Sequence, residues 1–414
     1  MALVVVHDRG VASPIELLAA LADREFVVVL GPSSYAAGVE PLFEHAKRPV
    51  VAWEGAAETA ARLRAHRPTG IVTFSEPMLR KTAILAEELG LQHHSPETAR
   101  ALTDKGLQRS LLRGAGVDTP QVRVVTELDA CRAACEEIGL PVVVKPVRGE
   151  GSRNTMLVDR DFDWTVMAQI LETERELIVE ELLRGAEVEE PFGDYVSVET
   201  AVSGGHQQHY AVTGKFQLAP PFRESGQYWP APLSESQRSD VVDLADRAVR
   251  ALGIRTGLVH TEIKLTPSGP RVIEVNGRLG GLQRELGLRG AGVDLIAAAA
   301  DLAEGHAVSI DVQPDQVYFQ HYTPGPVAAT RLVGLEGADA VRALPFVTQC
   351  RRLVRDGADL DRSQIIRLDL VCGVVAELTH LPAAITSIRD GLTYTFDGAD
   401  GRVSRTATDL IRRP

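Results

Sequence analysis

The chain has 414 residues, of which 44% are hydrophobic and 24% are charged. These proportions are typical of a soluble globular protein, and the length suffices for two or three domains with cores of their own. The net charge of −12 argues against nucleic acid or an anionic membrane surface as the main partner. We therefore expect no nucleic-acid partner and no membrane attachment.

Targeting features and cysteine spacing favour a cytoplasmic location. The opening MALVVVHDRG has an apolar run that is too short for a signal peptide, and it lacks the usual basic start. No stretch approaches the roughly 18 uninterrupted apolar residues of a membrane span. The cysteines form no CxxC pair and no zinc pattern; they are Cys131, Cys135, Cys350 and Cys372. This usage fits a reduced compartment.

Residues 1–94 predict an N-terminal βαβ domain. Short apolar runs alternate there with helical stretches, which is typical of a small parallel sheet. The runs cover residues 3–6, 26–30, 50–53 and 71–74. The region lacks GxGxxG, which argues against a dinucleotide site.

The rest of the chain predicts α+β units in three parts. Residues 95–186 would form linking helices, near Ser95 and over about 104–113, and a small α+β subdomain. The strands of that subdomain are expected at 121–125, 141–146, 155–158 and 176–183, with helices at about 127–138 and 161–173. Residues 187–315 predict a larger antiparallel sheet with one long helix. That sheet would use residues 195–217, 258–265 and 271–276, and the helix about 234–252. Residues 316–414 predict an α+β extension, so the fold class is α/β and α+β.

The stretch VHTEIKLTPSGPRVIEVNGRLGG predicts a β-hairpin with unusual charges. Two alternating runs flank TPSGP, and we expect residues 267–269 to form the loop. Glu262 then lies opposite Glu274, and His260 lies opposite Asn276. One face would carry His260, Glu262, Lys264, Glu274, Asn276 and Arg278. Like charges directly opposite each other destabilise a sheet, so either a ligand or free solvation must explain the pair.

Two further segments suggest nucleotide contacts. In VVVKPVRGEGSRN, Lys145 ends a strand, and small residues follow whose backbone N–H groups can approach phosphate oxygens. The alternative is a hairpin loop beside a solvated lysine. In ELIVEELLRGAE a strand ends before a hinge, where backbone groups can meet a purine edge and Glu187 can accept from ribose hydroxyls. The alternative there is a solvated acidic turn.

Taken together, five segments resemble the ATP-grasp superfamily over about residues 70–290. They are Lys105 in TDKGLQRSLLRGAGV, Lys145 in VVVKP, the loop RGEGSRN, VEELLRGAE, and HTEIKL with RVIEVNGRLGG. Their order and separations are similar to those of the family. The resemblance implies an N-terminal domain, a small ATP lid, a large antiparallel subdomain and a C-terminal extension.

The resemblance implies ATP and Mg²⁺ as cofactors, with Mn²⁺ as a possible substitute. Glu262, Glu274 and Asn276 would hold one or two ions that bridge the phosphates, which accounts for two facing carboxylates because magnesium prefers hard oxygen ligands. The implied nucleotide-binding residues are Lys105, Lys145, Gly151, Ser152, Glu180, Glu181, Leu183 and Glu187. Glu189 is an alternative ribose ligand, because VEEPFG intervenes before the next strand.

The implied reaction joins a carboxylate to an amine. The carboxylate attacks the γ-phosphoryl group to give an acyl phosphate and ADP, and the amine then displaces phosphate to form an amide. Arg278 is the catalytic candidate, since its planar fork suits the acyl-phosphate oxygens. Its alternative role is a structural ion pair with an acidic neighbour.

Within the superfamily, three segments resemble the L-amino-acid ligases that make dipeptides. They are TFSEPMLRKTAILAEELGL, VTGKFQLAPPFRESGQYWPAPLS and GLVHTEIKLT. The resemblance implies that Glu76 binds a substrate ammonium, that His260 lies in the amino-acid pocket, and that Lys215, Phe222, Arg223 and Tyr228 form a mobile flap over the substrates. Glu76 is alternatively an acid at a helix start, and His260 a satisfied sheet histidine.

Other functions stay open at this point. The substrates are expected to be a small-molecule carboxylate and an amine, both amino acids. The amine is alternatively an amino sugar, a polyamine or a carrier-bound amine. A non-catalytic nucleotide-binding regulatory protein and a biotin-carboxylase-like activity are further alternatives. A homodimer is plausible from the family.

Overall fold

The N-terminal sheet is parallel, as its apolar runs predict. Its strands are β1 (Ala2–His7), β2 (Phe26–Leu30), β3 (Val50–Ala52) and β4 (Pro68–Thr73). In the computed structural model, which describes residues 1–327, 330–360, 366–398 and 401–412, these strands run in the order β3-β2-β1-β4. The predicted βαβ layer is confirmed.

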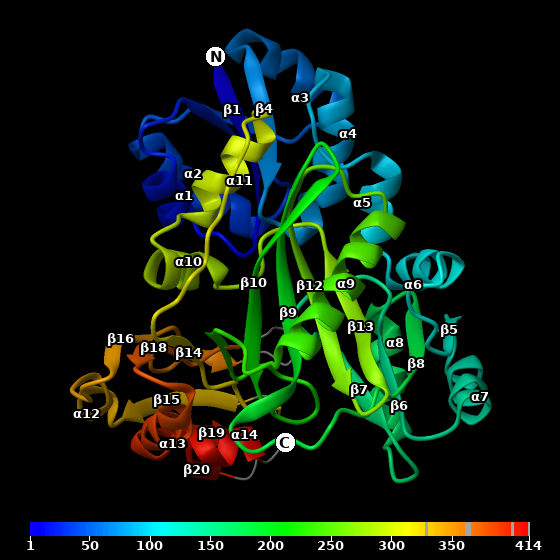
Figure 1. Cartoon of the computed structure of the whole chain (residues 1–414), viewed down its shortest axis with the longest axis vertical. Coiled ribbons are helices and arrows are strands. Elements are labelled where there is room, and N and C mark those ends of the chain that lie inside the picture. The colour runs from blue at the N-terminus through cyan, green and yellow to red at the C-terminus, as the bar shows by residue number, and fades with distance from the viewer. Residues whose placement is uncertain (328–329, 361–365, 399–400, 413–414) are drawn as a thin grey trace.

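Helices cover both faces of this sheet (Figure 1). One face packs against α1 (Pro14–Ala20), α2 (Ser34–His45) and α11 (Leu295–Ala303), and the other against α3 (Ala56–Leu63) and α4 (Leu79–Leu89). Because both faces are buried, the strands are apolar throughout and do not alternate. Since α11 comes from far along the chain, it ties the later part of the molecule to this sheet.

The small α+β subdomain is an antiparallel sheet with helices on one face. Its elements are β5 (Val122–Val125), α7 (Leu128–Ile138), β6 (Val142–Pro146), β7 (Met156–Val158), α8 (Trp164–Thr173) and β8 (Leu177–Glu181). The strand order is β5-β8-β6-β7. Cys131 and Cys135 are free thiols packed in the core beneath α7. The side chains of Lys145 and Glu180 lie on the opposite face of the sheet, which these helices do not cover.

Two linking helices precede this subdomain. They are α5 (Pro96–Leu102) and α6 (Lys105–Gly114). Ser95 accepts the N–H of Thr98 and Asp104 accepts the N–H of Leu107, so each helix begins at an N-cap side chain. The cap at Asp104 sets Lys105 as the first residue of α6.

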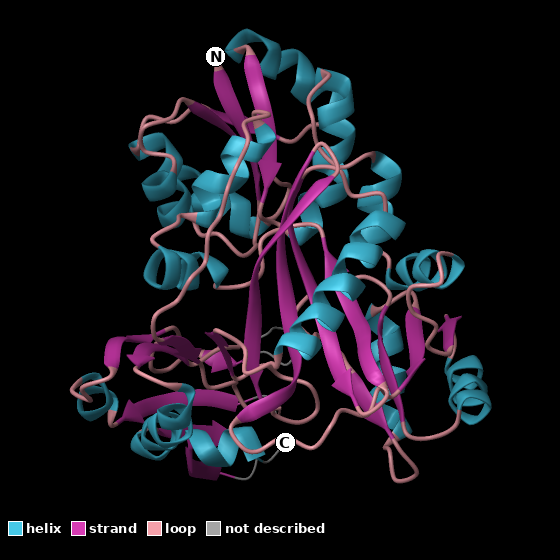
Figure 2. Cartoon of the chain, in the orientation of Figure 1, coloured by secondary structure: helices cyan, strands magenta, loops and turns pink. Residues whose placement is uncertain are grey.

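A single antiparallel sheet forms the centre of the molecule. Its strands are β9 (Phe192–Ser203), β10 (His206–Phe216), β11 (Gly226–Trp229), β12 (Gly257–Thr266), β13 (Gly269–Asn276), β14 (Val317–His321), β16 (Val347–Arg352) and β18 (Asp369–Val375). Their order is β13-β12-β9-β10-β11-β14-β18-β16. The long helix α9 (Glu235–Ala251) covers one face and lies across the strands in Figure 2. The sheet is continuous across the expected boundary between residues 315 and 316.

The C-terminal part adds a second small sheet. Its elements are β15 (Thr330–Glu336), α12 (Ala338–Arg342), β17 (Asp359–Leu360), α13 (Leu381–Gly391), β19 (Thr393–Gly398), β20 (Gly401–Thr406) and α14 (Ala407–Arg412). The strand order is β17-β15-β19-β20. These elements share one apolar core with β14 and β18, so the C-terminal part is packed onto the central sheet.

The β12–β13 hairpin keeps the predicted pairing at its charged end but differs at its turn. Glu262 lies opposite Glu274, and His260 lies opposite Asn276. The expected three-residue loop is wrong, because Thr266 pairs with Gly269 and leaves a shorter turn. A β-bulge at Ile273 adds one residue to β13 and restores the register.

Among the described residues, none of the helices combines the length and the apolarity needed to cross a bilayer.

Candidate active site

One face of the central sheet carries polar side chains from successive strands. Side chains two apart share a face, so the alternation of β9 to β13 sorts polar residues from apolar ones. The polar face holds Tyr195, Ser197, Glu199, Thr213, Lys215, Gln227, His260, Glu262, Glu274 and Asn276. The opposite face is apolar and packs under α9 with Val196, Val198, Val212, Ile263 and Val275.

The charge of Glu274 is compensated by a lysine from another element. Lys105, the first residue of α6, places its Nζ 2.9 Å from Glu274 Oε1. The same ammonium donates to the carbonyl of Gly149 at 2.7 Å. Burial by itself would raise the pKa of Glu274, but Lys105 and Lys145 outweigh it and hold the pKa below its ordinary value. Glu274 is therefore a carboxylate at neutral pH.

Arg278 and Glu76, both predicted site residues, lie in direct contact. Arg278 Nε is 3.1 Å from Glu76 Oε2, and its Nη2 is 3.7 Å from Glu150 Oε2. The guanidinium also donates to Asn276 Oδ1 at 3.5 Å. Glu76 begins the short 3₁₀ helix Glu76–Met78, and burial raises its pKa although Arg278 opposes the shift. In this arrangement the Glu76 carboxylate forms an ion pair with Arg278.

The paired positions on β12 and β13 supply a donor set suited to a hard cation. Glu262 and Glu274 are directly opposed, and Asn276 follows on the same face. Within the described ranges, no three His, Cys, Asp or Glu side chains form a preassembled metal cluster. Two carboxylates and an amide oxygen fit Mg²⁺, which usually keeps waters and phosphate oxygens among its ligands.

A second ion-pair group lies on the open face of the small sheet. Lys145 Nζ on β6 is 2.7 Å from Glu180 Oε2 on β8. Arg109 of α6 approaches the other oxygen, with Nε 2.8 Å from Glu180 Oε1. Burial would raise the pKa of Glu180, but Arg109 and Lys145 lower it to about 2. The Glu180 side chain is thus held between two cations, and β5 and β6 pair with its backbone on either side.

Arg109 was not predicted as a site residue. It also donates to the carbonyls of Val272 at 2.7 Å and of the bulged Ile273 at 2.9 Å. One side chain therefore joins the small sheet to the central hairpin. One feature of the sequence could have indicated Arg109. It follows Lys105 by four residues, which places both side chains on one face of the predicted helix.

The central part of the chain matches a known domain. Residues 138–285 match the family model described as the ATP-grasp domain. This segment is an ATP-grasp domain. It contains Lys145, Glu180 and the whole β12–β13 hairpin, so the resemblance predicted from the motifs is confirmed.

Solved and curated proteins extend the ATP-grasp comparison over more of the chain. The crystal structure of an L-amino acid ligase from Bacillus licheniformis superposes with a TM-score of 0.75 at 21% identity, covering 94% of this chain and 97% of that one, which confirms the fold. The uncharacterized protein y4rH of Sinorhizobium fredii is 28% identical over 71% of this chain and 61% of its own length. The alanine–anticapsin ligase of Bacillus subtilis is 30% identical over 51% of this chain and 48% of its own length. The chain thus spans about half to three-fifths of these curated relatives.

In this ATP-grasp domain, the glycine-containing loop joins β6 to β7. Gly151 and Ser152 have left-handed φ values of 62° and 59°, which turn the backbone sharply. Asn154 and Arg153 both donate to Glu174 and hold the far side of the loop, Asn154 at 2.9 Å. The N–H groups of the loop remain candidates for phosphate contacts.

The predicted adenine and ribose residues lie where β8 ends. Glu181, the last residue of β8, is 3.1 Å from Arg271. Leu183 follows it and is half-buried, whereas Glu187 and Glu189 are exposed. The choice between Glu187 and Glu189 as the ribose ligand stays a prediction.

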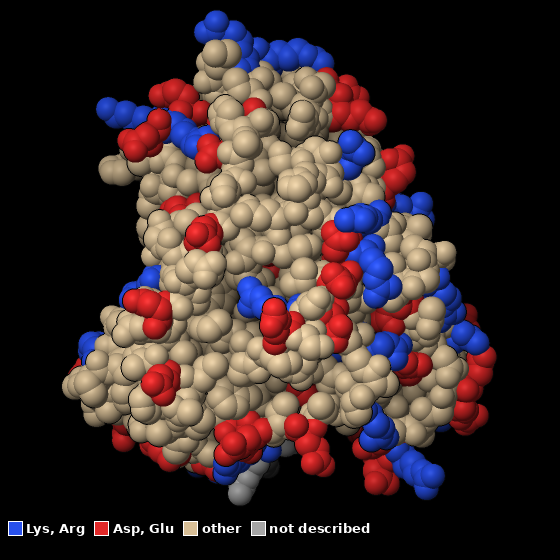
Figure 3. All heavy atoms as spheres, viewed as in Figure 1, with Lys and Arg blue, Asp and Glu red and all other residues tan. Residues whose placement is uncertain are grey.

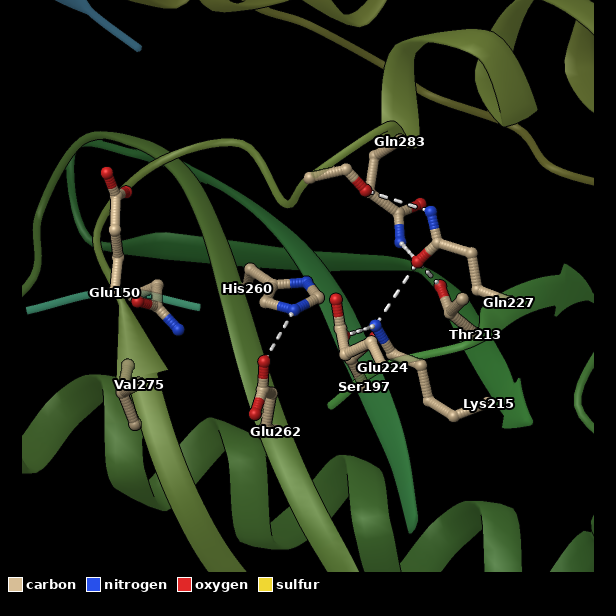
Figure 4. A network of polar contacts seen from close by, with 12 residues as sticks. Glu150, Ser197, Thr213, Lys215, Glu224, Gln227, His260, Glu262, Val275 and Gln283 are labelled. Carbon is tan, nitrogen blue, oxygen red and sulfur yellow. Dashed lines mark hydrogen bonds and ion pairs between the residues drawn. The ribbon is translucent and has the colours of Figure 1, made fainter. Parts of the chain in front are cut away.

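His260 is part of a buried hydrogen-bonded network (Figure 4). Its Nδ1 is 2.9 Å from Glu199 Oε2, and its Nε2 is 3.3 Å from Glu262 Oε1. Burial would lower the pKa of His260, but Glu199 outweighs it and raises the pKa to about 9. Ser197 and Thr213 donate to Glu199 at 2.7 and 2.9 Å. The network connects Glu262 to the interior of the sheet.

The expected flap is wrong for Lys215 and Tyr228, two of its four residues. Lys215 is 2% exposed on β10, and Tyr228 is 1% exposed on β11 with its ring stacked on Phe216. Both residues are therefore fixed in strands of the central sheet. Lys215 Nζ lies 3.3 Å from Glu224 and 3.2 Å from Gln227. Figure 4 draws both contacts.

Proposed function

We propose that this chain is an ATP-dependent carboxylate–amine ligase that joins two amino acids through an acyl phosphate, releasing ADP and phosphate. The observation that carries this proposal is the direct opposition of Glu262 and Glu274 on paired strands, with Asn276 beside them. Such a pair is unfavourable in a bare sheet and favourable around a divalent cation. Three cations from different parts of the chain, Lys105, Lys145 and Arg278, act on the charge of Glu274.

ATP would lie between the open face of the small sheet and the polar face of the central sheet. Lys105 and Lys145 are the candidates for phosphate contacts, together with the backbone of Gly151 and Ser152. Glu180 and Leu183, at the end of β8 and in the hinge after it, would line the adenine slot, and Glu187 would bind the ribose. Burial between two sheets would exclude water and strengthen each ionic contact.

Glu262, Glu274 and Asn276 would hold Mg²⁺, or Mn²⁺ in its place. When bound, the ion neutralises charge on the phosphate oxygens. Lys105 would then exchange its contact with Glu274 for a phosphate oxygen, since its ammonium already lies at that carboxylate. A flexible point charge of this kind suits such an exchange better than a planar fork.

The chemistry needs two displacements. An oxygen of the substrate carboxylate forms a bond to the γ-phosphorus, while the bond from that phosphorus to the bridging oxygen of ADP breaks. The amine nitrogen then bonds to the acyl carbon and loses a proton, and the carbon–oxygen bond to phosphate breaks. Arg278 would stabilise the acyl-phosphate oxygens. It lies in the right neighbourhood for this role, 3.5 Å from Asn276.

Amino acids are the substrates that best fit the remaining residues. Glu76 is a buried carboxylate beside Arg278, a pairing that suits a ligand carrying both an ammonium and a carboxylate. The names of two similar proteins, an alanine–anticapsin ligase and an L-amino acid ligase, support the same substrate class.

The test is ADP release over a matrix of paired amino acids, with products identified by mass spectrometry. We expect release that requires both an acid and an amine partner, together with stoichiometric amide. Turnover only with an amine that is not an amino acid would contradict the dipeptide assignment. ATP binding without hydrolysis or ligation over the whole screen would contradict the enzymatic proposal.

A further inference from the structure

A second charged cluster lies on the same polar face, on the side towards the C-terminal part. Its centre is Glu224, whose carboxylate receives three donors: Lys215 at 3.3 Å, Arg367 at 3.3 Å and the Tyr322 hydroxyl at 3.1 Å. The Arg367 guanidinium also lies over the Tyr322 ring, 4.7 Å from its centroid. Lys215 and Arg367 lower the pKa of Glu224 to about 2, although burial would raise it.

The two cations of this cluster share one ion-pair carboxylate, although Glu262 and Glu199 also lie near Lys215. Two cations, Lys215 and Arg367, contact one carboxylate, and Glu224 is the ion-pair partner that Arg367 has among the described residues. The further hydrogen bond of Lys215 goes to the neutral amide of Gln227 at 3.2 Å. An anion placed beside Arg367 would balance the charge.

The cluster adjoins the proposed reaction centre. Gln227 donates to the carbonyl of Gly281 at 2.8 Å, and a Cβ atom on Gly281 would lie 3.9 Å from Arg367 Nη2. Gly281 follows Arg278 by three residues in the segment that leaves β13. The missing side chain at Gly281 leaves room between this segment and the guanidinium.

Three buried polar atoms around this space lack hydrogen-bond partners among the described residues. They are the Nε of Arg367, the hydroxyl of Tyr195 and the Oε1 of Gln283. Tyr195 and Gln283 are 3% and 0% exposed. Burial raises the pKa of Tyr195, and the charges of Glu224 and Glu262 both add to the shift, so Tyr195 is near both clusters. Two hydrogen-bond donors and one acceptor thus lack partners, and a ligand that carries both accepting and donating groups would satisfy them.

We propose that this cluster is the subsite of the amine co-substrate and that Arg367 binds a carboxylate of that co-substrate. The inference rests on the proposed function and deepens it, because the acceptor must then be an amino acid or another amine that carries a carboxylate. Polyamines and amino sugars lack the group that Arg367 recognises. Arg367 presents a planar fork that matches a carboxylate, and Glu224 and Tyr322 hold it in position.

The backbone around Arg367 is fixed by the chain segment that carries Tyr322. Leu368 N–H donates to the carbonyl of Thr323 at 2.9 Å, and Gly325 N–H donates to the carbonyl of Ile366 at 2.8 Å. These two bonds flank Arg367 and hold it just before the start of β18. A substitution of the side chain therefore leaves the backbone contacts in place.

The test separates amine recognition from acid activation. Hydroxylamine carries no carboxylate and intercepts an acyl phosphate as a hydroxamate, so its reaction does not need the proposed subsite. For Arg367→Gln, we expect the KM for the amino-acid amine to rise at least about tenfold, because a charged hydrogen-bond pair is lost. The KM for ATP and the rate of hydroxamate formation should stay within about twofold of the wild-type values. Arg351→Gln, an exposed arginine of β16, is the matched control and should change neither.

A comparison on the wild-type protein keeps the proposal testable if the variant does not fold. An amino-acid amine and its carboxamide differ only in the group that Arg367 would bind. We expect the carboxamide to have the higher KM, and Arg367→Gln to remove the difference. Equal KM values in the wild type, or equal loss of amide and hydroxamate in the variant, would overturn the proposal. If the wild type forms no hydroxamate with any carboxylate, the proposed function itself is wrong.

Discussion

The Lys105 ammonium lies 2.9 Å from the Glu274 carboxylate and 2.7 Å from the carbonyl of Gly149. A single side chain at the start of α6 thus contacts both the central hairpin and the glycine-containing loop of the small sheet. The contact offsets one of two carboxylates that face each other on β12 and β13. It brings a positive charge to the place where we propose that the phosphates bind.

The first prediction concerns Glu274. Glu274→Gln is nearly isosteric and should abolish ADP formation while the protein stays folded, because the hairpin loses a charged oxygen for the cation. Steady-state ADP release and a thermal melting curve check the two halves of this expectation. Glu172→Gln, at an exposed position of α8, is the control and should retain activity. Retained turnover in Glu274→Gln would show that the metal site is misassigned.

Lys145 is predicted to bind ATP. Lys145→Met should weaken the binding of a non-hydrolysable ATP analogue by about tenfold or more, since a charge-assisted contact to phosphate is worth about 1.5–3 kcal/mol. Glu180 keeps its contact with Arg109 in this variant, so the fold should persist. Titration calorimetry measures the affinity, and the exposed Lys47→Met is the control. Unchanged affinity would remove Lys145 from the nucleotide site.

Arg109 is predicted to be a structural residue. Arg109→Met should lower the free energy of unfolding by about 3–5 kcal/mol, because Glu180 loses one cation and two buried carbonyls lose their donor. Arg109→Lys should lose less stability than Arg109→Met, since a lysine keeps a cation beside Glu180. Urea denaturation measures all three proteins beside the exposed control Arg100→Met. A loss no larger than that of the control would contradict the assignment.

Asp369 provides a test of pH dependence. Burial raises its pKa from 3.8 to about 6, although Tyr394 and Thr323 donate to it. The folded protein then holds this proton more tightly than the unfolded chain, so the group contributes stability below about pH 4 that is lost as the pH rises to 6. At 1.36 kcal/mol per pKa unit, the loss is about 3 kcal/mol.

The matched variant for this prediction is Asp369→Asn. Its free energy of unfolding, relative to the wild type, should increase by about that amount as the pH rises from about 3 to about 7, through both pKa values. Denaturant titrations at a series of pH values measure the difference, in which the other titrating groups cancel. A flat difference across this interval would show that Asp369 titrates at its ordinary pKa.

The sequence predicts the hairpin register because every second residue must face the same way. The pairing of Glu262 with Glu274 is confirmed although the turn was predicted one residue too long. The bulge at Ile273 compensates, and it coincides with the carbonyls that Arg109 contacts. A bulge stabilised by a side chain from another element leaves no signal in a local alternation pattern.

Long-range ion pairs are the other feature that local patterns miss. Arg367 and Glu224 are 143 positions apart, and only Glu224 belongs to a segment that the family resemblance uses. Lys215 and Tyr228 were assigned to a flap because glycines and prolines lie between them, whereas both are buried strand residues. The distribution of surface charge does not indicate the site either, because acidic and basic side chains are interspersed on the face that Figure 3 shows.

The central claim is that a substrate carboxylate is activated by phosphorylation. A carboxylate labelled with heavy oxygen tests it most directly, because the attacking oxygen stays with phosphorus when the amine displaces phosphate. We expect each released phosphate to carry one labelled oxygen and the amide to keep the other. Unlabelled phosphate, accompanied by amide formation, would contradict the acyl-phosphate route.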